Sequence, residues 1–143
     1  MAKLGRYSAD RKKVQSITDD ISLTVADCGT LMVLNKAAGA TVTLPSIADA
    51  GKGWWVRFVV GTNCTSNSYI ITEKASADTD TIRGGINELE VDDGEDGESS
   101  TGCTFITFPN GTDTVGDFAE VICDGTNWYV HGQAKLDGGC TLT

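Results

Sequence analysis

The residue types that usually carry catalysis or bind metals form no recognised catalytic or zinc-binding pattern in this sequence. Its one histidine, His131, has no serine or cysteine nucleophile motif near it. The cysteines are widely spaced and form no C-x-x-C pair, so we predict no zinc site. We therefore expect no enzymatic activity, no cofactor and no bound metal. We expect reduced, buried thiols, with disulfides or bridges between subunits as the alternative, at Cys28, Cys64, Cys103, Cys123 and Cys140.

The acidic run "ELEVDDGEDGE" over residues 88–98 is the strongest local bias in the chain. Calcium prefers oxygen-rich loops of this kind. The spacing departs from the EF-hand pattern, however, because Gly94 falls on the third ligand position and Cys103 on the twelfth. We expect a solvated loop here, and a calcium site remains the alternative.

Two adjacent tryptophans begin the apolar stretch "WWVRFVV". Successive side chains of a strand point to opposite faces, with Trp54, Val56, Phe58 and Val60 on one face and Trp55, Arg57 and Val59 on the other. We predict that Trp54 fills the core of the subunit. The opposite face, Trp55, Arg57 and Val59, is predicted to lie at a contact between subunits or under a loop, where the arginine can stack on an aromatic ring. An exposed ligand platform at Trp55 is the alternative.

The formal net charge of −9 is unevenly distributed. The first thirteen residues hold five basic side chains against Asp10 alone, a net of +4, which leaves −13 for residues 14–143. We predict a basic N-terminal arm at 1–18 and a folded body at 19–143. Such an arm can bind nucleic acid, anionic lipid or an acidic protein surface, and a disordered solubilising tail is the alternative. Because the acidic body would repel a phosphate backbone, we expect no nucleic-acid partner.

The body is predicted to be all-β. Short runs rich in β-branched and aromatic residues are separated by turn dipeptides such as Asp-Gly and Asn-Gly, and no convincing helical period appears after Thr18. This pattern predicts a compact sandwich or jelly-roll-like barrel of about 8–9 short antiparallel strands. The expected strands cover residues 22–27, 30–36, 41–44, 54–60, 69–73, 86–91, 103–108, 118–123 and 128–132.

Several of these strands are apolar on both faces, notably at 30–36, 54–60 and 103–108. The outer face of a lone sandwich is usually polar, so the pattern predicts an outer surface buried between subunits. Without an apolar run of roughly 20 residues or a signal sequence, we expect a soluble, unexported chain with no membrane partner.

Four segments resemble a β-structured module of tailed-bacteriophage virion proteins, namely capsid decoration (cement) proteins, head fibres and tail-fibre tips. In that module a V-T-L-P strand precedes G-x-x-W/Y-x-V/F-x-V, then D-x-I-x-G and finally G-D-x-x-E-L/V-x-x-D-G-T-x-W-Y-V. The matching residues are 42–45, 53–60, 80–84 and 116–130, and the resemblance extends over about 22–143. It implies a homotrimer without enzymatic activity.

Within this group, a compact body behind a short basic arm favours a capsid decoration protein, since the chain has no fibre shaft. We expect a homotrimer on the outer capsid surface of the virion, made in the host bacterial cytoplasm and bound to the major capsid protein. The residues expected to bind the capsid are Lys3, Arg6, Tyr7, Arg11, Lys12 and Lys13. The alternative is a head-fibre or tail-fibre-tip module that binds a host receptor or glycan through Trp55, Tyr129 and His131.

Overall fold

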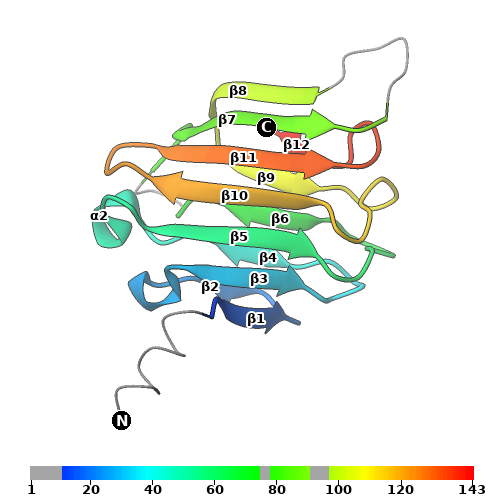
Figure 1. Ribbon diagram of the computed structural model, residues 1–143, viewed down its shortest axis with the longest axis horizontal. Coiled ribbons are helices and arrows are strands. Elements are labelled where there is room, and N and C mark those ends of the chain that lie inside the picture. The colour runs from blue at the N-terminus through cyan, green and yellow to red at the C-terminus, as the bar shows by residue number, and fades with distance from the viewer. Residues whose placement is uncertain (1–10, 75–77, 91–96) are drawn as a thin grey trace.

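The computed structural model describes residues 11–74, 78–90 and 97–143. Two β-sheets lie face to face, the larger in front and the smaller behind it in Figure 1. Sheet A has the strand order β1-β3-β5-β10-β11-β7-β8, and sheet B has the order β12-β9-β6-β4-β2. The predicted all-β class is confirmed.

The strands are short and follow one another closely along the chain. Their bounds are β1 (Lys13–Ile17), β2 (Ile21–Ser22), β3 (Thr30–Leu34), β4 (Thr41–Thr43), β5 (Trp55–Val60), β6 (Tyr69–Thr72), β7 (Ile82–Glu88), β8 (Gly97–Cys103), β9 (Phe105–Phe108), β10 (Phe118–Cys123), β11 (Trp128–Ala134) and β12 (Thr141–Leu142). A 3-10 turn, η1 (Val25–Asp27), and a four-residue helix, α2 (Ile47–Ala50), lie between strands.

The first six strands form a two-sheet coil. Strands β1, β3 and β5 pair in parallel within sheet A, and β2, β4 and β6 pair in parallel within sheet B, so the chain alternates between the sheets. The remaining strands add hairpins and one further parallel pair, β11 with β7. Within the described residues, five of the ten strand pairs are antiparallel, as expected, and five are parallel. The parallel pairs from β1 to β6 arise because the alternating path returns each strand to its own sheet in the same direction.

The core lies between the two sheets and consists of alternate residues from each strand. On β5, Val56, Phe58 and Val60 are buried, as the period-2 pattern requires. Trp54 precedes the strand with 2% of its surface exposed, and its ring meets that of Trp128 edge-on at 5.4 Å. The prediction that Trp54 fills the core is confirmed.

Two segments differ from their predicted structure at the N-terminal end. Residues 22–27 were expected to be one strand, but only Ile21–Ser22 pairs, and η1 follows. The Asp27 carboxylate accepts a hydrogen bond from the backbone N–H of Thr24 at 2.7 Å, which holds the chain in the turn. Residues 13–17 of the predicted arm form β1, since pairing with β3 satisfies their backbone groups.

The connections have the predicted turn chemistry. Gly51 and Gly53 adopt positive φ (73° and 86°) where the chain reverses before the tryptophans. The Asp124 carboxylate accepts hydrogen bonds from the N–H groups of Thr126 and Asn127, both at 2.7 Å, and so closes the turn into β11. Among the described residues, no helix is long and apolar enough to cross a membrane.

Candidate functional site

The outer face of sheet A is the candidate site. It is the side of the front sheet in Figure 1 that sheet B does not cover. Strand register brings its side chains into rows that run across the sheet. We call this surface the A face, defined by Val14, Leu31, Val33, Trp55, Arg57, Val59, Phe118, Glu120, Ile122, Tyr129 and His131.

The central strands give the A face an apolar and aromatic character. Ile122 on β10 lies directly between Trp55 on β5 and Tyr129 on β11. Ile122 and Tyr129 are each 44% exposed, and Val14 on β1 is 62% exposed. Clusters of large exposed apolar side chains of this kind are typical of binding surfaces.

An ion pair lies across the middle of the A face. The Arg57 Nε atom is 3.1 Å from a carboxylate oxygen of Glu120, and the guanidinium lies 4.8 Å from the centre of the Phe118 ring. The predicted stacking of Arg57 on an aromatic face is thus present, with phenylalanine as the aromatic partner. Because the charge is neutralised within the chain, the A face can approach another surface without leaving Arg57 unpaired.

The predicted capsid-binding residues are only partly within the described structure. Lys3, Arg6 and Tyr7 lie outside the described residues, and Arg11 is exposed. The Lys12 ammonium lies 5.7 Å from the centre of the Trp55 ring, and the Lys13 ammonium is 3.9 Å from the Asp27 carboxylate. The structure therefore joins Lys12 to Trp55, two residues to which the sequence assigned different roles.

Within the described residues, no group of side chains is arranged for catalysis or for metal binding. His131 is exposed on the A face, with its ring 6.1 Å from that of Phe118. No group of three histidine, cysteine, aspartate or glutamate side chains in the described ranges could hold a metal ion. Most of the acidic run, residues 91–96, lies outside these ranges, so the alternative of a calcium site there stays untested.

All five cysteines are free thiols. Burial raises the pKa of Cys64 to about 12, and it also raises the pKa values of Cys103, Cys123 and Cys140. Cys28, beside η1, is exposed, in contrast to the expected burial. Only Cys28 therefore combines access to solvent with a position outside the core.

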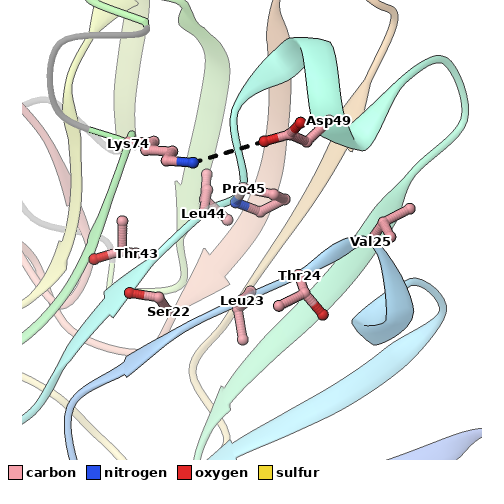
Figure 2. Close-up of a pocket in the computed structure, with 9 residues that line it drawn as sticks. All are labelled: Ser22, Leu23, Thr24, Val25, Thr43, Leu44, Pro45, Asp49 and Lys74. Atoms are coloured by element: carbon pink, nitrogen blue, oxygen red, sulfur yellow. Dashed lines mark ion pairs between the residues drawn. The ribbon is translucent and has the colours of Figure 1, made fainter.

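A second surface feature is a groove over strands β2 and β4 of sheet B. Its largest part, of about 440 Å³, lies between residues 22–25 and 43–45, with Asp49 and Lys74 on the far side. Figure 2 shows these two charged side chains paired with each other on that side of the groove, where the Lys74 ammonium is 3.6 Å from the Asp49 carboxylate. The Ser46 hydroxyl and Lys74 hold the pKa of Asp49 below its usual value.

Sequence reasoning identified A-face residues on β5 and, in the alternative of a receptor-binding module, on β11, and it missed the contributions of β3 and β10. Strand register alone places four further residues on the same face as Trp55, namely Leu31, Val33, Phe118 and Ile122. Two patterns in the sequence indicate outward-facing apolar residues on these strands. Every position from 31 to 34 is apolar, and bulky residues occupy alternate positions of β10. Neither pattern says which strands are adjacent in the sheet.

Comparisons of the chain with protein families, with curated proteins and with solved structures found no significant match.

Proposed function

We propose that this protein is a non-catalytic bacteriophage capsid decoration protein. It forms a homotrimer on the outer surface of the head and stabilises contacts between major capsid proteins. The A face supplies the contact between subunits, and the basic arm supplies the contact with the shell. The observation that carries the proposal is the combination of an uncovered apolar sheet face with a basic N-terminal segment next to it.

The A face supports the oligomer part of this proposal. Fully burying one large apolar side chain contributes about 1.5–3 kcal/mol. A neighbouring subunit can cover four A-face residues together, because they lie on adjacent strands. These residues are Trp55, Val59, Ile122 and Tyr129. Several such side chains per subunit are enough to offset the cost of association.

The arm supports the capsid part. Strand β1 carries the chain out of sheet A at the edge of the sheet, so residues before Lys13 begin at the rim of the A face. In a trimer three arms act together. If one arm binds with micromolar strength, about −8 kcal/mol, the later contacts become intramolecular and the assembly is retained on the shell. The three-arm clamp holds neighbouring capsomers against the outward pressure of packaged DNA.

Co-sedimentation with DNA-free, undecorated shells of the virus that encodes the protein tests this proposal. The wild-type protein should saturate the shells at a fixed ratio. Reversing two arm charges with Lys3→Glu and Arg6→Glu should reduce binding at least tenfold. The matched control, Lys52→Glu with Lys135→Glu, changes the net charge equally at two exposed positions of the body and should bind as the wild type does.

Two outcomes would contradict the proposal. If the arm variant saturates shells like the wild type, the arm does not bind the capsid. If the wild-type protein ignores shells and instead binds host cells, the chain is a head-fibre or tail-fibre-tip module that binds a receptor or glycan. Trp55, Tyr129 and His131, all on the A face, would then be the residues to substitute.

A further inference from the structure

The connection between β9 and β10 contains the one Asn-Gly pair of the sequence, Asn110-Gly111. An asparagine followed by glycine can lose ammonia without an enzyme, because the backbone nitrogen of the glycine can attack the side-chain amide. The sequence therefore places a reactive pair in this connection. The local structure decides whether the folded chain permits the reaction.

A tight turn presents this pair at the surface. The Pro109 carbonyl accepts hydrogen bonds from the N–H groups of Thr112 at 3.2 Å and Asp113 at 2.9 Å, which closes the turn around Asn110 and Gly111. Gly111 takes the third turn position with a φ of 99°, which glycine adopts without strain. Both central residues are exposed, and a Cβ added at Gly111 would meet no heavy atom within 4 Å beyond its chain neighbours. Water and space for a rearrangement are therefore available.

The attacking and attacked groups make no hydrogen bond to any other described residue. The Gly111 N–H has no acceptor among these residues, and the Asn110 side-chain amide has no partner among them. The Asn110 backbone is held separately, since its N–H donates to the Ser68 hydroxyl at 3.0 Å. The Gly111 nitrogen and the Asn110 side chain can therefore approach each other without first breaking a hydrogen bond of their own.

Two Asp-Gly pairs in the described part of the chain have the opposite arrangement. An Asp-Gly pair can form the same ring by losing water. In Asp137-Gly138 the glycine N–H donates to the Glu88 carboxylate at 2.8 Å. In Asp124-Gly125 the carboxylate accepts hydrogen bonds from the two N–H groups that follow the glycine, both at 2.7 Å. The fold thus holds a reacting group in place at these two pairs and leaves Asn110-Gly111 unprotected.

We propose that Asn110 is a modification site, at which the folded protein deamidates spontaneously with water as the only co-reactant. The Gly111 backbone nitrogen bonds to the Asn110 Cγ atom, and the Cγ–Nδ2 bond breaks. The side-chain nitrogen leaves as ammonia with the Gly111 amide proton, and a succinimide ring remains. Water then opens the ring, giving aspartate when the N–Cγ bond breaks and isoaspartate when the bond to the backbone carbonyl carbon breaks.

Both products change this surface. A neutral amide becomes a carboxylate, so each modified chain carries one more negative charge than the −9 of the sequence. Isoaspartate also adds one carbon atom to the main chain between Pro109 and Thr112, so the hydrogen bonds that close the turn must rearrange. The turn lies in the connection that leads into β10 of the A face. The chemistry itself does not depend on the proposed capsid role, and the two proposals fail in separate experiments.

Timed incubation of the full-length protein at neutral pH tests the proposal. Mass spectrometry of peptides follows the replacement of NH₂ by OH at each asparagine, and an isoaspartate methyltransferase with labelled S-adenosylmethionine detects the isoaspartyl product. We expect Asn110 to convert at least fivefold faster than Asn67, whose side-chain amide donates to the Ala38 carbonyl at 3.1 Å. Ion exchange should resolve one growing acidic species. The Asn110→Gln variant is the control and should lack that species, because glutamine forms the corresponding larger ring much more slowly.

The same measurement in guanidinium chloride separates the effect of the fold from that of the sequence. Rates in the unfolded chain depend on neighbouring residues alone. We expect the native rate at Asn110 to be no more than threefold below the unfolded rate, whereas isoaspartate at Asp137 should form at least tenfold more slowly in the native protein. A native rate at Asn110 more than threefold below the unfolded rate would overturn the proposal. So would a native rate less than fivefold above that of Asn67.

Discussion

At the scale of single residues, burial separates the cysteines into two groups. Cys64, Cys103, Cys123 and Cys140 lie in the core, and burial raises their pKa values, which suppresses the reactive thiolate. Cys28 lies outside the core and is exposed. The thiols therefore act as small apolar core residues at four positions and leave one position open to reagents.

We expect one rapidly reacting thiol per folded chain. Titration with a disulfide reagent such as DTNB at neutral pH should label Cys28 and leave the other four cysteines unlabelled until the chain is unfolded. The Cys28→Ser variant is the control and should show no rapid phase. Rapid labelling of two or more thiols in the native protein would show that the core opens more readily than its burial implies.

A buried carboxylate, Asp117, joins the start of β10 to the chain after β11. One carboxylate oxygen accepts a hydrogen bond from the Thr114 N–H at 2.8 Å, and the other accepts one from the Lys135 N–H at 2.9 Å. Asp117→Asn can keep only one of these acceptors. We expect it to lower the free energy of unfolding by about 1–3 kcal/mol, measured by urea denaturation. An unchanged stability at neutral pH would show that the two hydrogen bonds contribute little.

The same residue predicts a pH dependence. Burial raises the pKa of Asp117, so the folded state binds this proton more tightly than the unfolded chain does. Its contribution to stability is then greatest below about pH 3.9, the pKa of an unfolded aspartate, and decreases as the pH rises through the raised pKa. The stability difference between wild type and Asp117→Asn should be larger near pH 4 than at neutral pH, where the loss of one acceptor still leaves the variant less stable, and a difference that widens as the pH rises would reverse the assignment.

At the scale of elements, close approach between strands depends on glycine at particular positions. Gly84 has a φ of 131° at the irregularity between β7 and β8, and a Cβ there would lie 2.1 Å from the Val130 carbonyl oxygen. Gly132 on β11 is equally confined, since a Cβ would lie 2.3 Å from the Phe118 carbonyl oxygen. Strand β11 therefore approaches β7 and β10 closely at points where no side chain intervenes.

Gly132→Val should destabilise the protein by about 1–3 kcal/mol or more, because the added atoms must move the Phe118 backbone or the Ile86 side chain. Thermal and urea unfolding measure the loss. Gln133→Val, at the next position on the opposite face of the same strand, is the control and should be nearly neutral. Similar losses of stability in both variants would show that β11 does not tolerate valine at either position, and close strand packing at Gly132 would then not be the cause.

At the scale of the whole molecule, the two sheets present different outer faces. Sheet A carries the aromatic and aliphatic A face, whereas the outer positions of sheet B are mostly threonine, including Thr41, Thr43 and Thr72. Only one face of the sandwich is therefore rich in large apolar groups. An assembly of several chains buries the most apolar surface when the A faces are covered.

Ile122→Glu should dissociate the proposed trimer. Because Ile122 is 44% exposed in the single chain, its burial in the trimer contributes a little under half of about 1.5–3 kcal/mol, roughly 2–4 kcal/mol in total for three subunits. Sedimentation velocity at micromolar concentration should show trimers for the wild type and single chains for the variant. Phe105→Glu is the matched control, because Phe105 is 41% exposed on sheet B and Ile122 is 44% exposed on sheet A.

A wild-type protein that sediments as a single chain would contradict the proposed trimer. A trimer that survives Ile122→Glu but dissociates with Phe105→Glu would assign the contact to sheet B. Circular dichroism of both variants checks that each remains folded, which their exposed positions lead us to expect.

Local sequence alone determined the all-β class, the burial of Trp54 and the turns. Alternation of side chains along a strand and the backbone preferences of glycine and aspartate are properties of neighbouring residues, so they can be read without knowing the fold. The Asp124-Gly125 turn and the reversal at Gly51 and Gly53 were predictable for this reason.

Tertiary structure decided which strands became neighbours. Strand β8, "GESSTGC", has little strand preference of its own and forms because β7 offers it a pairing edge. The parallel coil from β1 to β6 and the row Trp55, Ile122 and Tyr129 depend on pairing between segments far apart in sequence, since Ile122 follows Trp55 by 67 residues. Residue patterns fix the face on which a side chain lies, but hydrogen bonding across the sheet determines which side chains meet on that face.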